Sequence, residues 1–518
     1  MNVLLSLLQK STDYNQLLKA VEAKQAVAVS GLSQAPRSHV LAAVHEQSGR
    51  PLIAVCQDDM AAKRLASELG AFLGEEPPVL PSRELTLAGA IGVSRQWEQQ
   101  RLRLLYALAQ GRVPVLVASL DALLLRTIPR QTLFSASVTL RVGAEYSMPD
   151  LISRLTRAGY SRASLVEGVG QFALRGGILD VYSPAQEKPL RTEFFGDELD
   201  TMGYFDPITQ RRTENADEAI LLPVAETEPH LHPQGVAGLC GDLRAIITRQ
   251  QRRKTPNQAL IETLQKDCEA LENETLFASA DRYMALIYPE FTTAASYLPQ
   301  EAVVAFCDHG NLQRGEKDRA EEFGLLLDSF LTAGTLFGEL CDYYATMDDL
   351  AASLHGRAVI YCDGFLAARY PESLPPKQLL SFTARQLPGY GGSLETAAAD
   401  LKNYASNQYG SIVLCGGQRR GEILKDLLAK SGLNALLAFP LTKLPQPGQI
   451  LIAGGSLPAG LEYPTLKFAI LTEGQIAVRQ ERKRTRTPKK ATNRKKLDSF
   501  TDPVSYTHLR AHETGAYL

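Results

Sequence analysis

This sequence of 518 residues lacks several features that mark whole classes of protein. No apolar run approaches the ~20 residues that span a bilayer, and the first residues show neither a basic segment nor a small-residue cleavage site. No two cysteines form a C-x-x-C pair, and none has histidine ligands nearby, which argues against a zinc site. We therefore expect a cytoplasmic protein with no membrane partner and with reduced, buried thiols at Cys56, Cys240, Cys268, Cys307, Cys341, Cys362 and Cys415.

Sequence motifs for catalysis are also absent. There is no G-x-S-x-G elbow, no intact G-x-x-x-x-G-K-[ST] loop and no acidic run after an apolar strand that would hold magnesium. His230 and His232 lie in "EPHLHPQ", a proline-flanked pattern typical of a surface loop, and the glycine-rich "LPGYGGS" (387–393) follows no predicted strand. We expect no catalytic residue, no metal and no cofactor in this chain, and binding as its main task.

One segment stands where a phosphate-binding loop would be expected. The stretch "SGLSQAPRSHVLAAV" (30–44) follows a predicted strand and opens a predicted helix, but only Gly31 and Ser38 match the loop pattern. Pro36 removes a backbone N–H from the phosphate cradle, and Arg37 replaces the compact lysine ammonium with a planar fork. Pro36 also suits the first turn of an ordinary helix. The loop is predicted not to bind nucleotide.

The pattern of apolar segments predicts an α/β multidomain protein. Buried-type strands such as "AVAVS" (26–30) and "VPVLVAS" (113–119) alternate with helical segments, which indicates a parallel sheet covered on both faces. From Val138 to Leu222 short strands are separated by Gly, Pro and Asp, which favours a small α+β module. The expected parts are a first α/β domain in two pieces (1–136 and 224–350), the small module (137–223), a second α/β domain (351–478) and a basic linker (479–503).

The basic linker concentrates positive charge in an otherwise acidic chain. Residues 479–496, "RQERKRTRTPKKATNRKK", hold ten Lys and Arg against one Glu, whereas the whole chain has a net charge of −2. Thr, Pro and Asn without apolar periodicity are typical of a solvated segment. The alternative is a weak, salt-dependent contact with DNA phosphates.

A phenylalanine lies on the polar face of a predicted strand in the small module. In "LRTEFF" (190–195) the residues Arg191, Glu193 and Phe195 share one face at period two. If the hairpin turns about Gln186, Phe195 lies opposite Gly177, within diagonal reach of Arg175. The alternatives are a ring buried under a neighbouring domain, or a bulge at Gly176–Gly177 that shifts the register and inverts the faces.

Several segments together resemble the bacterial transcription-repair coupling factors, and the central ones carry a signature shared with the excinuclease B subunit. The segments are "VLPSRELTL" (79–87), "RLRLLYAL" (101–108), "AGYSRASLVEGVGQFALRGGILDVYSP" (158–184), "RTEFFGDELDTMGYFDPITQRR" (191–212), "FTARQLPGYGG" (382–392) and "RKKLDSFTD" (494–502).

The resemblance implies a function and a set of site residues. Members of this family recruit the excinuclease A subunit to lesions where RNA polymerase has stalled, and the full-length protein is an ATP-dependent DNA translocase that displaces the polymerase. The contact with excinuclease A falls by position on Arg175, Arg191 and Phe195, which is also the composition of an interface hot spot. The resemblance further implies that the first α/β domain is a helicase-like domain without a working nucleotide site.

After Asp502 the resemblance stops. A polymerase-binding domain and a motor that uses ATP and Mg²⁺ are expected to follow in the family, and RNA polymerase and duplex DNA would be bound there. Instead the segment "VSYTHLRAHET" (504–514) looks like one reading frame of a sequencing adapter, so we expect residues 504–518 to be a non-native tail and His508, His512 and Glu513 to have no role. The rival hypotheses are an excinuclease-B-like, nucleotide-dependent helicase and a DNA-binding protein acting through 479–496.

Overall fold

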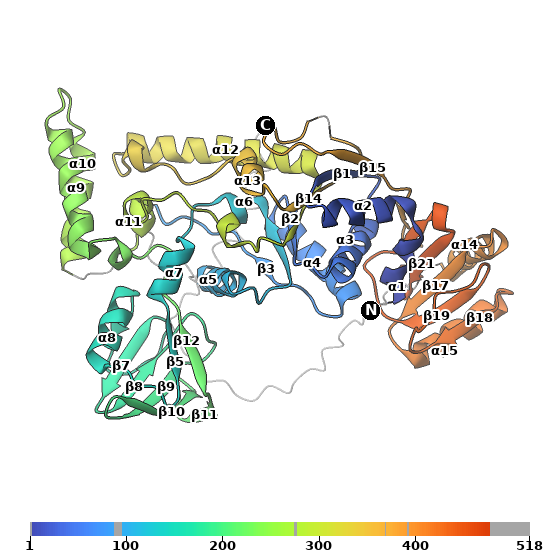
Figure 1. The fold of residues 1–518 in the computed structure, drawn as a ribbon, viewed down its shortest axis with the longest axis horizontal. Helices are drawn as coiled ribbons and strands as arrows, with labels where there is room; N and C mark the ends of the chain where they lie inside the picture. Colours follow the sequence, from blue (N-terminus) through green and yellow to red (C-terminus); the bar gives the residue numbers. More distant parts are fainter. Residues whose placement is uncertain (1–2, 88–95, 274–276, 368, 391–392, 477–518) are drawn as a thin grey trace, which may run out of the picture. The chain divides into compact units, whose positions relative to one another are not determined.

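The computed structural model describes residues 3–87, 96–273, 277–367, 369–390 and 393–476. Its first sheet has seven parallel strands in the order β15-β1-β14-β13-β2-β4-β3 (Figure 1). Most of these strands are buried along their whole length, as expected when helices cover both faces of a sheet. The strands are β1 (Ala26–Ser30), β2 (Leu52–Cys56), β3 (Val79–Leu80), β4 (Val115–Ser119), β13 (Val303–Cys307), β14 (Ala358–Cys362) and β15 (Gln378–Ser381).

The strand order corrects one predicted domain boundary. The segment "AVIYCD" (358–363) falls within the predicted second α/β domain (351–478), but as β14 it lies between β1 and β13 in the first sheet. A parallel crossover can insert a late strand at the centre of a sheet, so the order along the chain does not give the order in space. The second α/β sheet therefore starts beyond β15.

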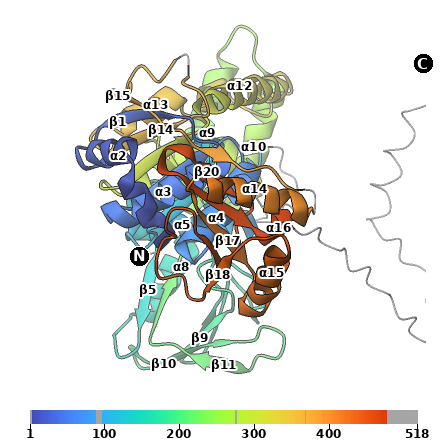
Figure 2. The ribbon, with the colours of Figure 1, turned by 90° about the vertical axis from the view of Figure 1, so that its right-hand side faces the viewer.

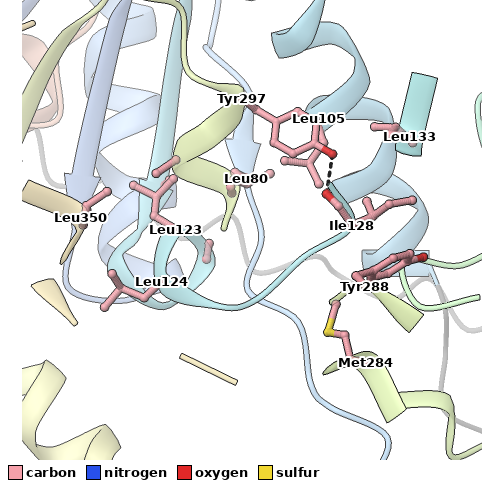
Figure 3. Close-up of a cluster of buried hydrophobic side chains, with 14 of the residues drawn as sticks. Leu80, Leu105, Leu123, Leu124, Ile128, Leu133, Met284, Tyr288, Tyr297 and Leu350 are labelled. Atoms are coloured by element: carbon pink, nitrogen blue, oxygen red, sulfur yellow. Dashed lines mark hydrogen bonds between the residues drawn. The ribbon is translucent and has the colours of Figure 1, made fainter. Parts of the chain in front are cut away.

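The helices of the first α/β domain bury an apolar core on each side of the sheet. In one core the Tyr297 hydroxyl donates to the Ile128 carbonyl at 2.6 Å, and leucines from several elements surround this pair (Figure 3). A buried tyrosine needs such a partner because an unsatisfied hydroxyl is costly. The principal helices are α2 (Thr12–Glu22), α3 (Gln34–Ser48), α4 (Asp59–Leu73), α5 (Gln96–Ala109), α9 (Gly235–Gln251), α10 (Gln258–Glu272) and α12 (His309–Thr332).

The second α/β sheet has six strands in the order β16-β20-β21-β17-β19-β18. They are β16 (Arg385–Gln386), β17 (Gly410–Cys415), β18 (Ala435–Ala438), β19 (Ile450–Gly454), β20 (Leu461–Tyr463) and β21 (Phe468–Thr472), with α14 (Leu394–Ser406) and α15 (Gln418–Lys430). Figure 2 shows β17, β18 and β20 of this sheet with the helices α14 and α15. The predictions for the basic linker and the tail fall on 477–518, outside the described residues.

The small module combines helix α8 (Met148–Arg157) with two sheets. β5 (Val138–Arg141) pairs with β12 (Glu218–Leu221), and the larger sheet has the order β11-β10-β9-β8-β7-β6. Its strands are β6 (Ser161–Arg162), β7 (Gln171–Arg175), β8 (Ile178–Val181), β9 (Leu190–Phe195), β10 (Glu198–Phe205) and β11 (Arg212–Asn215). Leu151 and Leu155 of α8 belong to the same buried cluster as Leu179 and Leu190, so one face of the larger sheet forms the core of the module.

The described part of the chain contains no group of three or more His, Cys, Asp or Glu side chains placed to hold a metal ion. His230 instead contacts Glu228, with 2.7 Å between Nδ1 and Oε1. All seven cysteines are free, and all but the partly buried Cys341 are buried. Among the described residues, no helix is both long and apolar enough to cross a membrane.

Candidate functional site: the outer face of the small module

The larger sheet of the small module has one face turned away from its core, and we call this the outer face. It is formed by alternate residues of β7, β8, β9 and β10, because successive side chains of a strand point to opposite sides. Leu190 and Thr192 of β9 are buried in the module, whereas the side chain of Phe195 is 84% exposed. The predicted faces of this strand are therefore confirmed, and no neighbouring domain covers the ring within the part of the chain that the structure describes.

The predicted register is wrong by one residue. Ile178 pairs with Glu193, and the amide of Phe194 donates to the carbonyl of Gly177 at 2.8 Å, so Gly177 faces Phe194 rather than Phe195. On the other side, Phe195 pairs with Glu198 of β10. A one-residue slip changes the cross-strand neighbours of β9, but the faces of the strand follow from its own alternation and stay as predicted.

The Gly176–Gly177 pair is a turn rather than a bulge. It joins β7 to β8 directly, since Arg175 pairs with Ile178, and Gly176 has φ +60°, a left-handed conformation that glycine adopts without strain. A Cβ at Gly177 would lie 2.7 Å from the Phe194 carbonyl oxygen. Small residues at the turn thus let β8 and β9 approach closely beside the exposed ring.

The two predicted arginines meet at one buried carboxylate that the sequence did not single out. Arg191 donates from Nε to Asp180 Oδ1 at 2.7 Å and from Nη2 to Oδ2 at 2.8 Å, while Arg175 donates to Oδ2 at 2.9 Å. Asp180 is only 1% exposed. Two guanidinium groups share this one carboxylate, and on the same face Glu193 lies 3.6 Å from Arg212, so positive and negative side chains alternate there.

The arginines differ in how far they are available to a partner. The Arg191 side chain is 21% exposed, and its guanidinium stacks 4.5 Å from the centre of the Phe205 ring. The hydrogen bond to Asp180 raises the pKa of Arg191 above its ordinary value. Arg175 is 52% exposed and makes only one of the contacts with Asp180. Arg175 and Phe195 thus face solvent, whereas Arg191 chiefly orders the surface between them.

Sequence reasoning missed two exposed apolar residues here. Ile178 of the outer face is 38% exposed, and Ile208, in the adjoining loop between β10 and β11, is 90% exposed. The main-chain carbonyl of Gln210 in the same loop accepts a hydrogen bond from Arg191 Nη1 at 3.1 Å. The signal available in the sequence was "FDPITQ" (205–210), a turn segment with an apolar residue at its centre.

The predicted degenerate phosphate loop lies at the start of α3, and its polar groups are engaged within the protein. Pro36 is in the first turn of the helix, as the ordinary-helix interpretation requires. The Arg37 side chain is 8% exposed and donates to Asp308 at 2.7 Å, while the Ser38 hydroxyl donates to Glu68. A Cβ at Gly31 would lie 2.0 Å from the carbonyl oxygen of Phe382, so a neighbouring main chain passes directly over this glycine.

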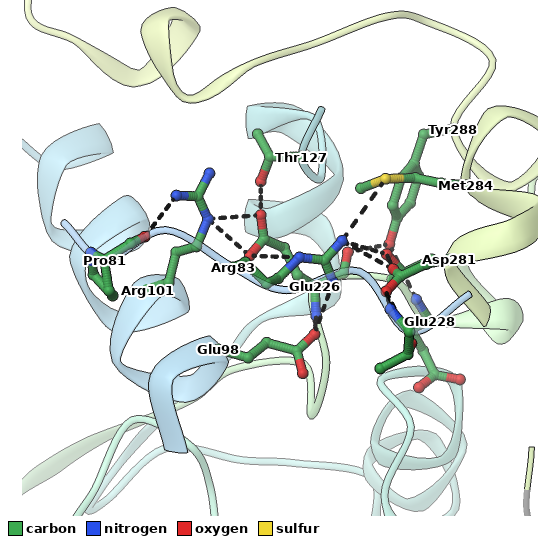
Figure 4. Close-up of polar contacts among 12 residues, drawn as sticks. Pro81, Arg83, Glu98, Arg101, Thr127, Glu226, Glu228, Asp281, Met284 and Tyr288 are labelled. Carbon is green, nitrogen blue, oxygen red and sulfur yellow. Dashed lines mark hydrogen bonds and ion pairs between the residues drawn. The ribbon is translucent and has the colours of Figure 1, made fainter. Parts of the chain in front are cut away.

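A buried ionic network joins the carboxyl end of the small module to the first α/β domain (Figure 4). Glu226, which is fully buried, accepts from Arg101 Nε at 3.0 Å and lies 3.8 Å from Arg83 Nε. Arg83 also donates to Asp281 at 2.9 Å. Charges this deeply buried require such pairing. The network is structural, and its arginines lie in "VLPSRELTL" and "RLRLLYAL".

Comparisons with known proteins agree with this arrangement. Residues 138–226 match the family described as the UvrB interaction domain, and these residues are the small module. Over 99% of its length the chain is 23% identical to the transcription-repair-coupling factor of Bacillus subtilis (strain 168), and 25% identical to that of Staphylococcus aureus (strain USA300). The chain covers 43% and 44% of these relatives, less than half of their length. The similarity to transcription-repair coupling factors that the motifs predict is confirmed.

Proposed function

We propose that this chain is the amino-terminal part of a transcription-repair coupling factor, and that the outer face of its small module binds the excinuclease A subunit of nucleotide excision repair. The observation that carries the proposal is Phe195, which is 84% exposed in the module that matches the UvrB interaction domain. An exposed aromatic ring on a face that also carries arginines is the typical composition of a binding hot spot.

The whole protein would bring this module to DNA lesions where RNA polymerase has stalled. Displacement of the polymerase, translocation on duplex DNA and hydrolysis of ATP with Mg²⁺ would be functions of segments that this chain does not include. The first α/β domain would be a helicase-like scaffold, because the groups at the start of α3 that could hold a phosphate are engaged with other protein groups. The same observation speaks against an excinuclease-B-like helicase acting through nucleotide.

The test measures binding of purified excinuclease A to wild type and to Phe195→Ala by isothermal titration calorimetry. We expect the variant to bind at least ~30-fold more weakly, about 2 kcal/mol, because the ring would occupy a pocket in the partner. Its free energy of unfolding should stay within about 0.5 kcal/mol of wild type, as for other exposed sites.

Phe365→Ala is the matched control, because Phe365 is 91% exposed and lies in the first α/β domain. It should bind like wild type. If Phe195→Ala binds as tightly as wild type, or if Phe365→Ala loses as much affinity, the outer face is not the docking site. Duplex DNA in place of excinuclease A tests the rival DNA-binding function.

A further inference from the structure

The loop between β10 and β11 presents an isoleucine to solvent on a rigid frame. Ile208 is 90% exposed. Asp206 Oδ1 accepts from the amide of Ile208 at 3.0 Å, and from the amide and hydroxyl of Thr209 at 2.7 and 3.0 Å. The amide of Gln210 closes the turn on the Asp206 carbonyl at 2.8 Å. The loop is therefore ordered by its own polar groups, while its apolar side chain contributes nothing to the core.

The same loop is fastened to the outer face. Gln210 has a left-handed conformation with φ +58°, which directs its carbonyl to Arg191 and its side-chain amide to the carbonyl of Pro207 at 2.8 Å. Arg191 holds Asp180 with the rest of its guanidinium. One continuous set of hydrogen bonds thus runs from Arg175 through Asp180 and Arg191 to the loop.

We propose that Ile208 is a second apolar anchor for the partner that binds Phe195, and that Asp206 positions it. This inference rests on the proposed function and adds a contact to it. A loop already fixed in its bound form loses little entropy on binding, which is the benefit of preorganisation. The partner surface would offer two apolar pockets with polar groups between them, because Arg191 and Glu193 lie between the two anchors on β9.

The spacing of the two anchors suits one interface. Phe195 lies four residues beyond Arg191 on β9, or roughly 13 Å at ~3.3 Å per residue. Ile208 is on the loop that contacts Arg191 directly. A standard interface covers about 800 Å² on each partner, or roughly 30 Å across if it is round. Both side chains can therefore lie in one footprint, with Arg191 between them along β9.

The experiment titrates purified excinuclease A into the full chain carrying Ile208→Ala, Phe195→Ala or both. Ile208→Ala should bind roughly tenfold more weakly, with an unchanged unfolding midpoint, and the two effects should multiply because the sites are well separated. Ile423→Ala is the matched control, since Ile423 lies on helix α15 of the second α/β domain and is 57% exposed. It should bind like wild type.

The outcomes separate this inference from the proposed function. If Phe195→Ala weakens binding and Ile208→Ala binds like wild type, the second anchor alone is overturned. If excinuclease A does not bind the wild-type chain, both the proposed function and the proposed role of Ile208 are wrong. If Ile423→Ala weakens binding as much as Ile208→Ala, the loss is not specific to the loop and the anchor is rejected.

Two substitutions at Asp206 test the positioning role. Asp206→Asn keeps the Oδ1 acceptor that receives all three hydrogen bonds, so its affinity should stay within about twofold of wild type. Asp206→Ala removes that acceptor, and we expect binding roughly three- to fivefold weaker, because the loop must then be ordered on binding. Equal affinities of the two variants would overturn the claim that Asp206 positions Ile208.

Discussion

The degenerate phosphate loop and the outer face of the small module each contain an arginine hydrogen-bonded to an aspartate. They differ in whether their other residues contact the rest of the protein or are exposed to solvent. At the start of α3, Ser38 donates to Glu68 and a main chain passes over Gly31. On the outer face Phe195 is 84% exposed, and in the adjoining loop, which Asp206 and Gln210 hold by hydrogen bonds, Ile208 is 90% exposed. At the first site Arg37 and Ser38 bond to side chains of the same protein, whereas the second leaves apolar area for a partner to cover.

The two arginine–aspartate pairs also differ in which member is buried. Arg191 is partly exposed over the almost fully buried Asp180, while Arg37 is buried beside Asp308, whose side chain is 41% exposed. Removing an arginine strands a carboxylate only where water cannot reach that carboxylate. The comparison therefore predicts unequal costs for the same substitution in the two places.

The largest expected effect is that of Arg191→Ala. It removes two of the three arginine hydrogen bonds that Asp180 receives and the stacking on Phe205. We expect the free energy of unfolding to fall by about 3 kcal/mol, at the lower end for a broken buried pair because Arg175 remains. Urea denaturation followed by circular dichroism would measure it.

Arg175→Ala is the control for that experiment, because the Arg175 side chain is 52% exposed and contributes one hydrogen bond to Asp180. It should cost no more than about 1 kcal/mol. Equal and small losses in the two variants would mean that Asp180 does not depend on Arg191. Weaker partner binding by Arg191→Ala must accordingly be corrected for unfolded protein before it is assigned to the interface.

The second prediction is that pH changes the stability of the region around α3 but not binding by the outer face. His39 of α3 is buried, its Nε2 lies 3.0 Å from the Leu4 carbonyl oxygen, and its Nδ1 lies 2.9 Å from the Tyr463 hydroxyl. Since the carbonyl can only accept, Nε2 carries the proton and Nδ1 accepts from Tyr463. Burial lowers the pKa of His39 to about 4.

The sign follows from proton uptake. Between the unfolded pKa of about 6.5 and the folded value, the unfolded chain binds more protons, so stability falls as pH falls through this window. From pH 6 to 4.5 the loss contributed by His39 should be about 2 kcal/mol, at ~1.4 kcal/mol per unit. His39→Gln should remove this contribution, whereas His309, whose pKa burial also lowers to about 4, keeps its own. The small module contains no histidine, so the affinity of its outer face for excinuclease A should vary little from pH 7.5 to 6. If this affinity falls together with the free energy of unfolding, the two regions do not respond to pH separately.

A smaller effect is expected for Arg37→Ala. Asp308 keeps access to water, so its carboxylate is not stranded, and the loss should be about 1 kcal/mol. Asp308→Asn leaves the buried Arg37 guanidinium without a counter-charge and should cost more than Arg37→Ala. Thermal melts of both variants beside Arg191→Ala would show the order. A loss of 3 kcal/mol or more in Arg37→Ala would mean that the burial of the carboxylate does not decide the cost.

Local patterns in the sequence predicted the features that depend on local geometry. Period-two alternation placed Phe195 on the solvent face, and the strand–loop–helix pattern located the start of α3. Cross-strand neighbours were not predictable. Asp180 lies opposite Arg191 only in the observed register of β8 and β9, and a shift of one residue would give it another neighbour. The place of β14 was missed for a related reason, since strand order in a parallel sheet is set by crossovers. Ile208 was missed because period-two reasoning does not extend to loops.

The last prediction is that restoring the phosphate-loop pattern does not restore nucleotide binding. It tests whether Pro36 and Arg37 alone, or also the groups around the loop, prevent binding. The double substitution Pro36→Gly with Arg37→Lys recreates G-x-x-x-x-G-K-S from Gly31 to Ser38. We expect no isotherm with magnesium-ATP from wild type or from this variant. The main chain over Gly31 remains, Ser38 still donates to Glu68, and the amide of Ala35 at the helix start still donates to Gln386 at 3.3 Å.

Saturable binding of magnesium-ATP by the double variant alone would show that only the side chains of Pro36 and Arg37 prevented binding. Saturable binding by wild type that disappears in Ser38→Ala would show that the loop is a working nucleotide site and that the proposed contrast with the outer face is wrong.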